Sequence, residues 1–534
     1  MAQPITARTQ SVARWAKVID HESCIGCHAC STACKSENEV PLSVNRTYVK
    51  YVDVGIFPEA RRSFQVTRCN QCADAPCTQA CPTRAMYARD DGIVDFDKSI
   101  CIGCKACIAA CPYDAIFINP EDHSAEKCNF CAHRVDVGLE PACVVVCPTE
   151  ALMIGDLNDP GSRVAKMVHR EPVVVRRPEK ETRPKLFYRG AHQATLDPLA
   201  AERPGGGLFM WSEQTTGGHH VVSGHPLEDS GRDTDGNSAV GHAGGANSSA
   251  AAVLAYDVPH KAPWDWRVSL YTLTKGIAAG AYLVPLLLLL FHAIDAESPL
   301  WMWAAPIVGG VFLGITGLLL ISDLEHPGRF YMIFTKAHWR SWLVKGSFII
   351  AGYSAILGIH FLGSLMRSEW IAGHLAWLGL PLAVLTAVYT AYLFAQAKAR
   401  DLWQSPLLPP HLLVQTLLAG SATLLPVAAF IEPGAVNPLL WTFAGSSLIH
   451  VLMVAGETTL AHTTAHARLA THEMTDGRYR TFFRLGVALT AAAVLAPWLA
   501  TSGVPLALIA LVGLVGLLCF EHAYVQAGQS VPLA

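Results

Sequence analysis

The sequence predicts an α+β domain in the N-terminal part of the chain, followed by an all-α polytopic membrane bundle of eight transmembrane helices. Two observations predict this division. Sixteen of the seventeen cysteines in the 534-residue chain lie between Cys24 and Cys147. Hydrophobic residues make up 51% of the chain and charged residues only 16%, and the apolar excess begins near Val268. A chain of this length exceeds one hydrophobic core, so we expect separate domains.

The cysteines form four groups of four. These groups are Cys24, Cys27, Cys30 and Cys34; Cys69, Cys72, Cys77 and Cys81; Cys101, Cys104, Cys107 and Cys111; and Cys128, Cys131, Cys143 and Cys147. The first and third groups have the spacing C-x2-C-x2-C-x3-C, which is the bacterial ferredoxin spacing for thiolates that bind a [4Fe–4S] cluster. Sixteen thiolates in four groups predict four [4Fe–4S] clusters and an α+β ferredoxin-like domain over residues 1–155.

Zinc and disulfide bonds are the alternatives for these cysteines. C-x2-C is also a zinc spacing, but the third and fourth cysteines of a run are superfluous for one tetrahedral zinc ion. Disulfides need an oxidising compartment, and two-residue gaps suit metal ligation better. Proline follows the last cysteine of three groups, at Pro82, Pro112 and Pro148, as it does in the ferredoxin run. Iron–sulfur ligation is therefore the favoured interpretation.

The groups are expected to exchange ligands in pairs, because the fourth cysteine of a run binds the other cluster in two-cluster ferredoxins. Only 19 residues, Pro82 to Ile100, separate groups two and three, which predicts that these two form one crossed pair and that groups one and four form the other. The expected ligand sets are Cys24, Cys27, Cys30 and Cys147; Cys128, Cys131, Cys143 and Cys34; Cys69, Cys72, Cys77 and Cys111; and Cys101, Cys104, Cys107 and Cys81.

Eight apolar stretches follow, and each has about the length that crosses a bilayer as a helix. They are 268–292, 300–322, 342–364, 371–395, 411–432, 436–460, 482–501 and 504–524. Buried helices of a soluble protein are the alternative, which eight consecutive stretches disfavour. The sequence therefore predicts an eight-helix transmembrane domain over residues 263–534.

The segment between the two parts, 156–262, is expected to be an extended and partly disordered linker. Leu186, Phe187 and Tyr188 could dock on a partner. From Gly217 to Ala252 the chain consists largely of Gly, Ser, His, Asp and Asn, which cannot bury enough apolar surface to order the segment. The histidines of this segment are interpreted as polar linker residues, with metal binding as the alternative: His219, His220, His225 and His242.

Loop charges predict the orientation in the membrane. The N-terminal flank and the even-numbered loops carry eleven basic residues, whereas the odd-numbered loops carry only Arg367. The eleven are Lys261, Arg267, Arg329, Lys336, Arg340, Lys398, Arg400, Arg468, Arg478, Arg480 and Arg484. Residues 1–17 contain no apolar signal region and no twin-arginine pair, so nothing there indicates export. We expect a multi-pass protein of the bacterial inner membrane, with the ferredoxin-like domain and both termini on the cytoplasmic side. The net charge of −3 gives no indication of nucleic-acid binding.

The cysteine segments resemble the iron–sulfur subunit of DMSO reductase-type and polysulfide reductase-type complexes. The matching runs are CIGCHACSTACK, RCNQCADAPCTQACPTRA, CIGCKACIAACPYDAI and KCNFCAHRVDVGLEPACVVVCPTEA. The membrane half resembles the polysulfide-reductase-type quinone-reactive anchor in AAGAYLV (278–284) and SDLEHPGRFYMIF (322–334), although that family commonly has D-L-G-R-P where this chain has Asp323 to Pro327. The resemblance implies two subunits fused in one chain, together with a separate catalytic subunit that carries molybdopterin.

A cluster chain attached to a membrane bundle needs a lipid-soluble redox partner, and a quinone (menaquinone or ubiquinone) is the expected one. Ionisable residues within spans are rare and often functional. Six residues near the expected cytoplasmic ends of the spans are therefore candidates for the quinone site: Tyr271, Lys275, Asp323, Glu325, His326 and Glu457. The alternative is that Lys275 extends to the headgroups and that Asp323 and Glu457 hydrogen-bond between helices. Haem, which would need facing axial histidines, is a rival cofactor.

The cysteine groups and the apolar spans predict an electron-transfer and membrane-anchor subunit, and the resemblance implies that it belongs to a molybdopterin oxidoreductase complex. Such a subunit relays electrons through four clusters between the catalytic subunit and membrane quinone or quinol. Two other functions stay open. One is a redox-driven proton-translocating module, to which the mid-span His450 could belong, and the other is a purely structural anchor of the same complex.

Overall fold

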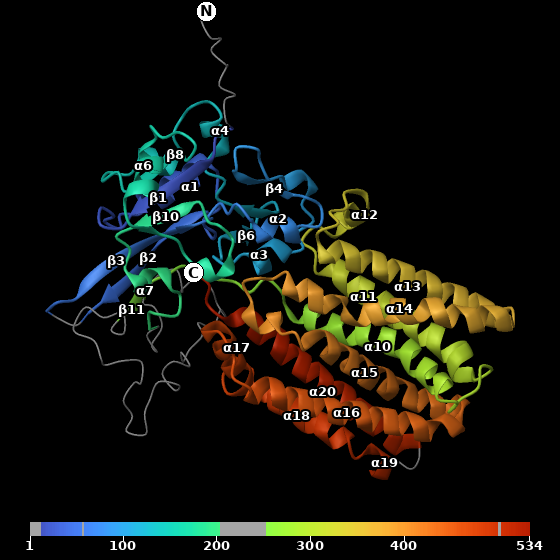
Figure 1. Ribbon diagram of the computed structural model, residues 1–534. Helices are drawn as coiled ribbons and strands as arrows, with labels where there is room; N and C mark the ends of the chain where they lie inside the picture. Colours follow the sequence, from blue (N-terminus) through green and yellow to red (C-terminus); the bar gives the residue numbers. More distant parts are fainter. Residues whose placement is uncertain (1–11, 56–57, 203–251, 500–502) are drawn as a thin grey trace, which may run out of the picture.

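The computed structural model of the chain describes residues 12–55, 58–202, 252–499 and 503–534. Figure 1 shows an N-terminal domain of short strands and helices at one end of a bundle of long helices. The ferredoxin-like domain and the helical, membrane-like region that the cysteine spacing and hydropathy predict are therefore both present in the described residues.

Two small sheets form the frame of the N-terminal domain. In the first, β1 (Trp15–Asp20) pairs parallel with β10 (Leu186–Arg189) and antiparallel with β8 (Leu152–Asp156), and β9 (Val173–Val174) extends the sheet beyond β10. In the second, β2 (Thr47–Val54) lies between β3 (Arg61–Arg68) and β11 (Val253–Tyr256). The first sheet combines strands from before and after the cysteine groups, and the second joins two strands that lie between the first and second groups to a strand that follows the fourth.

The segment expected to be a linker, 156–262, contributes to both of these sheets through β9, β10 and β11. The prediction that Leu186 and Tyr188 dock on a partner was wrong, because both side chains are buried in a core shared with Ile19 of β1. A short strand gains this burial only when a distant strand offers its edge. The Gly- and Ser-rich stretch, 217–252, lies outside the described residues except for Ala252, and so do its four histidines.

The cysteine groups lie on tight turns, short helices and hairpins. Groups one and three repeat the same local path: Gly26 and Gly103 both have φ +68, and the next turn residues, His28 and Lys105, have φ 59 and 61. Each turn leads into a helix, α1 (Ala29–Glu37) or α3 (Ala106–Ala110). The remaining elements are α2 (Pro76–Ala80), β4 (Met86–Ala88), β5 (Val94–Phe96), β6 (Ile116–Ile118), β7 (Ala125–Lys127), α4 (Ala132–Val135), α5 (Ala142–Val145), α6 (Arg163–Arg170) and α7 (Gln193–Leu196).

Long apolar helices form the second region. They are α10 (Trp266–Leu290), α11 (Ala305–Ser322) with the π-helical turn η4 (Leu300–Ala304) before it, α13 (Trp342–Leu365), α14 (Glu369–Ala395), α15 (Leu408–Ile431), α16 (Val436–Thr459), α18 (Arg480–Ala493) and α20 (Gly503–Ser530). Shorter helices, α12 (Met332–Thr335), α17 (Ala465–Thr475) and α19 (Ala496–Leu499), lie at the bundle ends in Figure 1.

Seven of the described helical stretches are long and apolar enough to cross a membrane, and they coincide with seven of the eight predicted spans. The remaining predicted span, 482–501, corresponds to α18 and α19, which the residues Val494 and Leu495 separate. Because α18 has only 14 residues, it does not reach the length of a span by itself. The count of eight spans stays a prediction.

Helix α10 is the most enclosed of the long helices and packs closely on α15. At their crossing, a Cβ atom added to Gly280 would lie 2.7 Å from Cα of Gly420, so the two backbones touch. Small residues permit such close approach between helices in a membrane. This contact holds α10 against α15, and Tyr271 and Lys275 are buried in the N-terminal half of α10.

Candidate cluster sites and membrane cavity

One cavity of the N-terminal domain is lined by Cys24, Cys27, Cys30 and Cys147, and we call it site 1. Three of these cysteines belong to the first group and one to the fourth. The cavity encloses about 330 Å³ not filled by atoms. The turn at Gly26 and the loop before β8 therefore bring together cysteines that are more than a hundred positions apart in the sequence.

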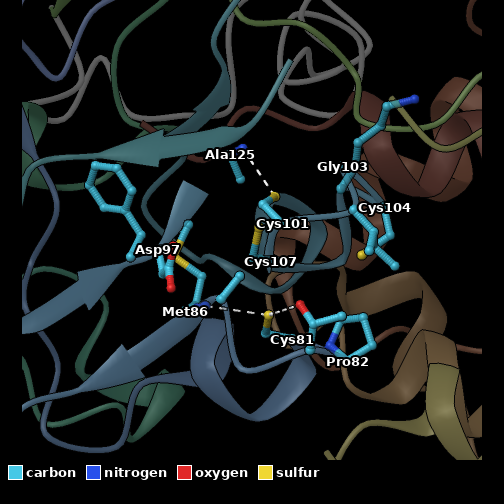
Figure 2. A pocket seen from close by; sticks show the side chains of 14 residues that line it. Cys81, Pro82, Met86, Asp97, Cys101, Gly103, Cys104, Cys107 and Ala125 are labelled. Atoms are coloured by element: carbon cyan, nitrogen blue, oxygen red, sulfur yellow. Dashed lines mark hydrogen bonds between the residues drawn. The ribbon is translucent and has the colours of Figure 1, made fainter. Parts of the chain in front are cut away.

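A second cavity, site 4, is lined by Cys81, Cys101, Cys104 and Cys107 and encloses about 350 Å³. Figure 2 shows these sulfurs around the cavity between the strand carrying Met86 and the turn at Gly103. The backbone N–H of Met86 donates to Sγ of Cys81 and that of Ala125 to Sγ of Cys101, each at 3.4 Å. Backbone donors thus stabilise negative charge on two of the four sulfurs.

The remaining eight cysteines gather in two further sets, which we call site 2 (Cys34, Cys128, Cys131 and Cys143) and site 3 (Cys69, Cys72, Cys77 and Cys111). At site 2, Nδ2 of Asn38 lies 3.7 Å from both Cys34 Sγ and Cys131 Sγ. Burial first, and then the neighbouring Cys128 and Cys143, raise the pKa of the Cys34 thiol to about 12.

At site 3, burial and then the neighbouring Cys69 raise the pKa of Cys72 to about 12, and Cys111 acts in the same direction. Such thiols stay protonated at neutral pH unless a metal centre or a cation stabilises the thiolate. Cysteines of the same expected ligand set thus lie near one another, and their ligation of clusters stays a prediction.

The sites fit a group larger than one metal ion and negatively charged. Within the described residues, no three His, Cys, Asp or Glu side chains are arranged to hold a single metal ion. Beside site 2, the guanidinium of Arg68 is buried, and its Nε and Nη2 have no hydrogen-bond partner in the described part of the protein. Buried unpaired donors are costly, which is consistent with an anionic group at this place.

The loop between α11 and α13 forms hydrogen bonds to the backbone around site 4 from the membrane side. Nη1 of Arg329 donates to the carbonyls of Lys98 and Cys101, each at 2.9 Å. Nδ1 of His338 lies 2.9 Å from the carbonyl of Cys81, and Oγ of Ser341 donates to the carbonyl of Ala80 at 2.8 Å. Site 4 is therefore held against the helical bundle by hydrogen bonds to its own ligand loops.

Glu325 and His326, two of the quinone candidates, lie in this domain contact. Oε1 of Glu325 is 3.0 Å from Nζ of Lys105. The N–H of His326 donates to the carbonyl of Ile102 at 3.2 Å, and its ring nitrogen is 3.5 Å from Oγ of Ser124. Their positions favour a docking role over contact with a ligand inside the bundle.

Directly behind site 4 lies the bundle cavity, an apolar space of about 1050 Å³. Helices α10, α11, α13 and α14 enclose it, and its lining includes Cys104 of site 4. Tyr271 and Asp323, two of the predicted residues, also line it. Asp323 lies just beyond the end of α11, 3.4 Å from Nζ of Lys105. Burial raises the pKa of its carboxyl to about 6, against the opposing effect of that ammonium group.

Lys275 lies on α10, one helical turn further into the bundle than Tyr271. Its Nζ donates to the carbonyl of Ala387 and to Oγ1 of Thr390, both at 2.8 Å, and the hydroxyl of Tyr271 donates to the same Thr390 oxygen at 3.3 Å. The ammonium also lies 5.2 Å from the ring centre of Tyr389. Lys275 is therefore enclosed by the helices and does not extend to the headgroups.

Glu457 does not line the bundle cavity. It belongs to a polar array of which the sequence analysis named only Glu457 and His450. Its Oε1 is 3.1 Å from Nδ1 of His411, whose Nε2 is 2.8 Å from Nδ1 of His450. A separate cavity of about 310 Å³ connects His411 with Glu521, which accepts a hydrogen bond from Thr272 at 2.9 Å. Glu521 was missed although an acid within a span was visible in the sequence, as was His411 at the start of the predicted fifth span.

Comparison with known proteins agrees with this architecture. Residues 257–532 match the family described as polysulphide reductase, NrfD, and residues 61–157 match a 4Fe-4S dicluster domain. The chain is 44% identical over 194 residues to the B component of tetrathionate reductase from Salmonella typhimurium, which covers 35% of this chain and 76% of that protein. It is also 44% identical over 177 residues to the B component of polysulfide reductase from Wolinella succinogenes, covering 33% of this chain and 93% of the relative.

Protein NrfC of Escherichia coli is 40% identical over 189 residues, which are 34% of this chain and 84% of that protein. The matches to iron–sulfur subunits and the match to a membrane family fall on successive parts of one polypeptide, as the resemblance of the cysteine and membrane motifs predicted. The protein belongs to the polysulphide reductase NrfD family, and a 4Fe-4S dicluster domain similar to the iron–sulfur components of polysulfide and tetrathionate reductases is fused in front of its membrane region.

Proposed function

We propose that the protein is the electron-transfer and membrane-anchor subunit of a molybdopterin oxidoreductase complex and relays electrons between a catalytic subunit and membrane quinone. One observation carries this proposal: Cys104 lines both site 4 and the bundle cavity. A cofactor held at site 4 is then in contact with the space in which a quinone would bind. Purely structural anchoring would not require a redox ligand in the wall of a membrane cavity.

In this proposal sites 1 to 4 each hold one [4Fe–4S] cluster. Bound clusters supply one-electron storage, and the protein sets their positions and surroundings. Cys27 at site 1 is exposed, whereas every cysteine of sites 2 and 3 is buried. Site 1 is thus the end that a soluble partner can approach, and site 4 is the end that faces the bundle. No motif of the sequence predicts a molybdopterin site, so the catalytic centre is assigned to the partner subunit.

The bundle cavity suits the head and first isoprenoid units of menaquinone or ubiquinone. Its wall is mainly apolar, with few polar groups, which is typical of sites for small apolar cofactors. Quinone chemistry exchanges protons together with electrons. The carboxyl of Asp323 supplies a group that can accept or release a proton beside Cys104. The oxygen of Tyr271, whose O–H donates to Thr390, can accept a hydrogen bond. Lys275 orients Tyr271 through their shared contact, Thr390.

The direct test is the cofactor content of the detergent-purified protein, handled without oxygen. We expect close to sixteen iron atoms per molecule and four EPR-detectable clusters. Cys24→Ser and Cys34→Ser are expected to perturb different clusters, because Cys34 lies with the fourth group at site 2. If both variants perturb the same cluster, the crossed assignment is wrong, and an iron content far below sixteen contradicts the whole proposal.

The quinone part is tested separately with the unaltered protein in detergent. A stoichiometric amount of a menaquinol analogue should reduce the clusters, and an Asp323→Asn variant should retain its iron but react slowly. If the protein binds all its iron but the quinol analogue does not reduce its clusters, the protein is a structural anchor only.

The orientation is also proposed: the bundle crosses the bacterial inner membrane with the cluster domain in the cytoplasm. The bias of basic residues toward one set of loops supports it. A C-terminal alkaline phosphatase fusion should be inactive, and a green fluorescent protein fusion should fluoresce. High phosphatase activity would place the cluster domain on the opposite side.

A second candidate function, redox-driven proton movement, is favoured by the polar array around His411. Glu457, His411, His450 and Glu521 place ionisable groups along the bundle interior, and Nε2 of His450 has no hydrogen-bond partner among the described residues. Buried ionisable groups in a membrane often mark proton paths. Quinol-driven turnover in liposomes should acidify one compartment if this function operates, and His450→Phe should abolish the acidification without changing cluster reduction.

A further inference from the structure

Two buried cations contact one sulfur atom at site 2. Nη1 of Arg68 lies 3.1 Å from Sγ of Cys143, and Nζ of Lys17 lies 3.5 Å from the same sulfur. Each side chain has only 1% of its surface exposed. Arg68 is the last residue of β3 and Lys17 is in the middle of β1, so the two sheets of the domain deliver these charges from different directions.

Neither cation is neutralised by a carboxylate. Within the part of the protein that the structure describes, neither residue forms an ion pair, and Lys17 has the ring of Phe130 at 4.7 Å as a further neighbour. Two unpaired buried charges would be strongly destabilising, so their counter-charge must be an anionic group at site 2.

Site 4 differs from site 2 in this respect. Its sulfurs accept from the neutral backbone N–H groups of Met86 and Ala125, as Figure 2 shows. The nearby cation, Lys105, is paired with the carboxylates of Asp323 and Glu325. Lys127, between sites 2 and 3, donates to the carbonyls of Val94 and Cys128 and not to a sulfur.

We propose that Arg68 and Lys17 raise the reduction potential of the cluster at site 2 above that of the cluster at site 4. This inference rests on the proposed four-cluster function. Each electron that arrives at a site adds one negative charge, which a neighbouring positive charge stabilises in a medium of low dielectric constant. Site 2 would then retain electrons between the membrane end and the partner end of the cluster row.

The test is an EPR-monitored redox titration of the full-length protein in detergent. Arg68→Met and Lys17→Met keep the length of the side chain and remove its charge. Each is expected to lower the equilibrium constant for one-electron reduction at site 2 by about tenfold or more, which corresponds to 59 mV for a one-electron couple. The signal of site 2 is identified as the one lost in Cys34→Ser. The signals of sites 3 and 4 should stay in place in both variants. Because Arg68 also acts on Cys30 of site 1, only Lys17→Met is expected to leave the site 1 signal unmoved.

The matched control is Arg62→Met, because Arg62 lies on the same strand, is exposed and pairs with Asp53 at 2.7 Å. It should shift no cluster. Arg68→Lys should restore most of the potential that Arg68→Met loses. If Arg68→Met fails to bind iron at site 2, Lys17→Met and Arg68→Lys decide the question.

Two results would overturn the inference: sixteen iron atoms with an unmoved site 2 signal in Lys17→Met and Arg68→Met, or an equal shift of all four signals. Fewer than four clusters in the unaltered protein would instead contradict the proposed function.

Discussion

The two C-I-G-C turns of the protein share a sequence and a backbone path but have opposite surroundings. Ile102, in the third cysteine group, is buried with Leu324, Ile333 and Val344 of the membrane region. Ile25 occupies the same position in the first group and has 56% of its surface exposed. The difference shows that one turn already has its docking partner within the same polypeptide, whereas the other presents the same kind of apolar surface to the outside.

Because of this difference, the two ends of the cluster domain are not equivalent. Cys27, next to Ile25, is exposed, and the apolar Val145 and Val146 beside Cys147 are exposed as well. Scattered apolar residues on a surface are ordinary, but a patch next to a redox site is a reasonable docking surface. We therefore expect the membrane region to cover one end of the cluster row and the catalytic subunit to cover the other.

The largest effect is expected when the covered turn receives a charge. Ile102→Asp places a carboxylate without a partner in the contact with the membrane region, which costs about 3–5 kcal/mol. We expect the cluster domain to detach from the bundle, so that quinol no longer reduces the clusters while dithionite still does. Ile102→Val is the matched control and should retain quinol-linked reduction. Normal reduction by quinol in Ile102→Asp would show that this contact does not hold site 4 in place.

The next effect concerns the proton at the covered end. Because burial raises the pKa of Asp323 to about 6, its carboxylate accepts a proton from quinol only above that pH. The rate of quinol oxidation should therefore fall as the pH drops below about 6. Asp323→Asn should lower the rate about 100-fold and remove this pH dependence. Stopped-flow measurement of cluster reduction from about pH 5 to about pH 8 checks both, and an unchanged pH profile in the variant would assign the proton to another group.

A smaller effect is expected from the glycine of the covered turn. Gly103 has φ +68, and a Cβ atom there would overlap Cβ of Glu325. Gly103→Ala should therefore destabilise the fold by about 1–3 kcal/mol and weaken the domain contact. Gly138 has φ +79 with no atom within 4 Å of an added Cβ, so Gly138→Ala isolates the backbone cost. Thermal unfolding of both variants measures the difference. Equal losses would mean that the contact with Glu325 contributes nothing.

The comparison also shows what the sequence could predict. The spacing of the cysteines is a local property, and it predicts a cluster-binding domain and the crossed ligand sets, which stay a prediction. Hydropathy likewise predicted seven of the long helices within a few residues. Both signals depend on neighbours in the sequence and not on tertiary contacts.

Contacts between distant segments could not be predicted in this way. The strands β10 and β11 form only because β1 and β2 offer an edge, so a short apolar run such as Leu186 to Tyr188 looked like part of a linker. Glu325 and His326 are near a span end, but the loop turns toward Lys105 and Ile102. The charges of Arg68 and Lys17 beside Cys143 depend on how two sheets pack, which no spacing records.

The smallest effect is expected at the uncovered turn. Ile25→Asp changes an exposed side chain, so the isolated protein should keep its stability, its iron content and its reduction by quinol. Binding of the catalytic subunit should weaken about tenfold, because a charge would replace an apolar contact at the centre of the proposed docking surface. Co-purification and titration of the partner onto the detergent-solubilised protein measure the change in affinity. Leu42→Asp is the control, because Leu42 is 93% exposed and lies outside the lining of site 1. Equal weakening by both substitutions would mean that the partner does not dock over site 1, and the likeness between the two turns would then be one of ligand geometry alone.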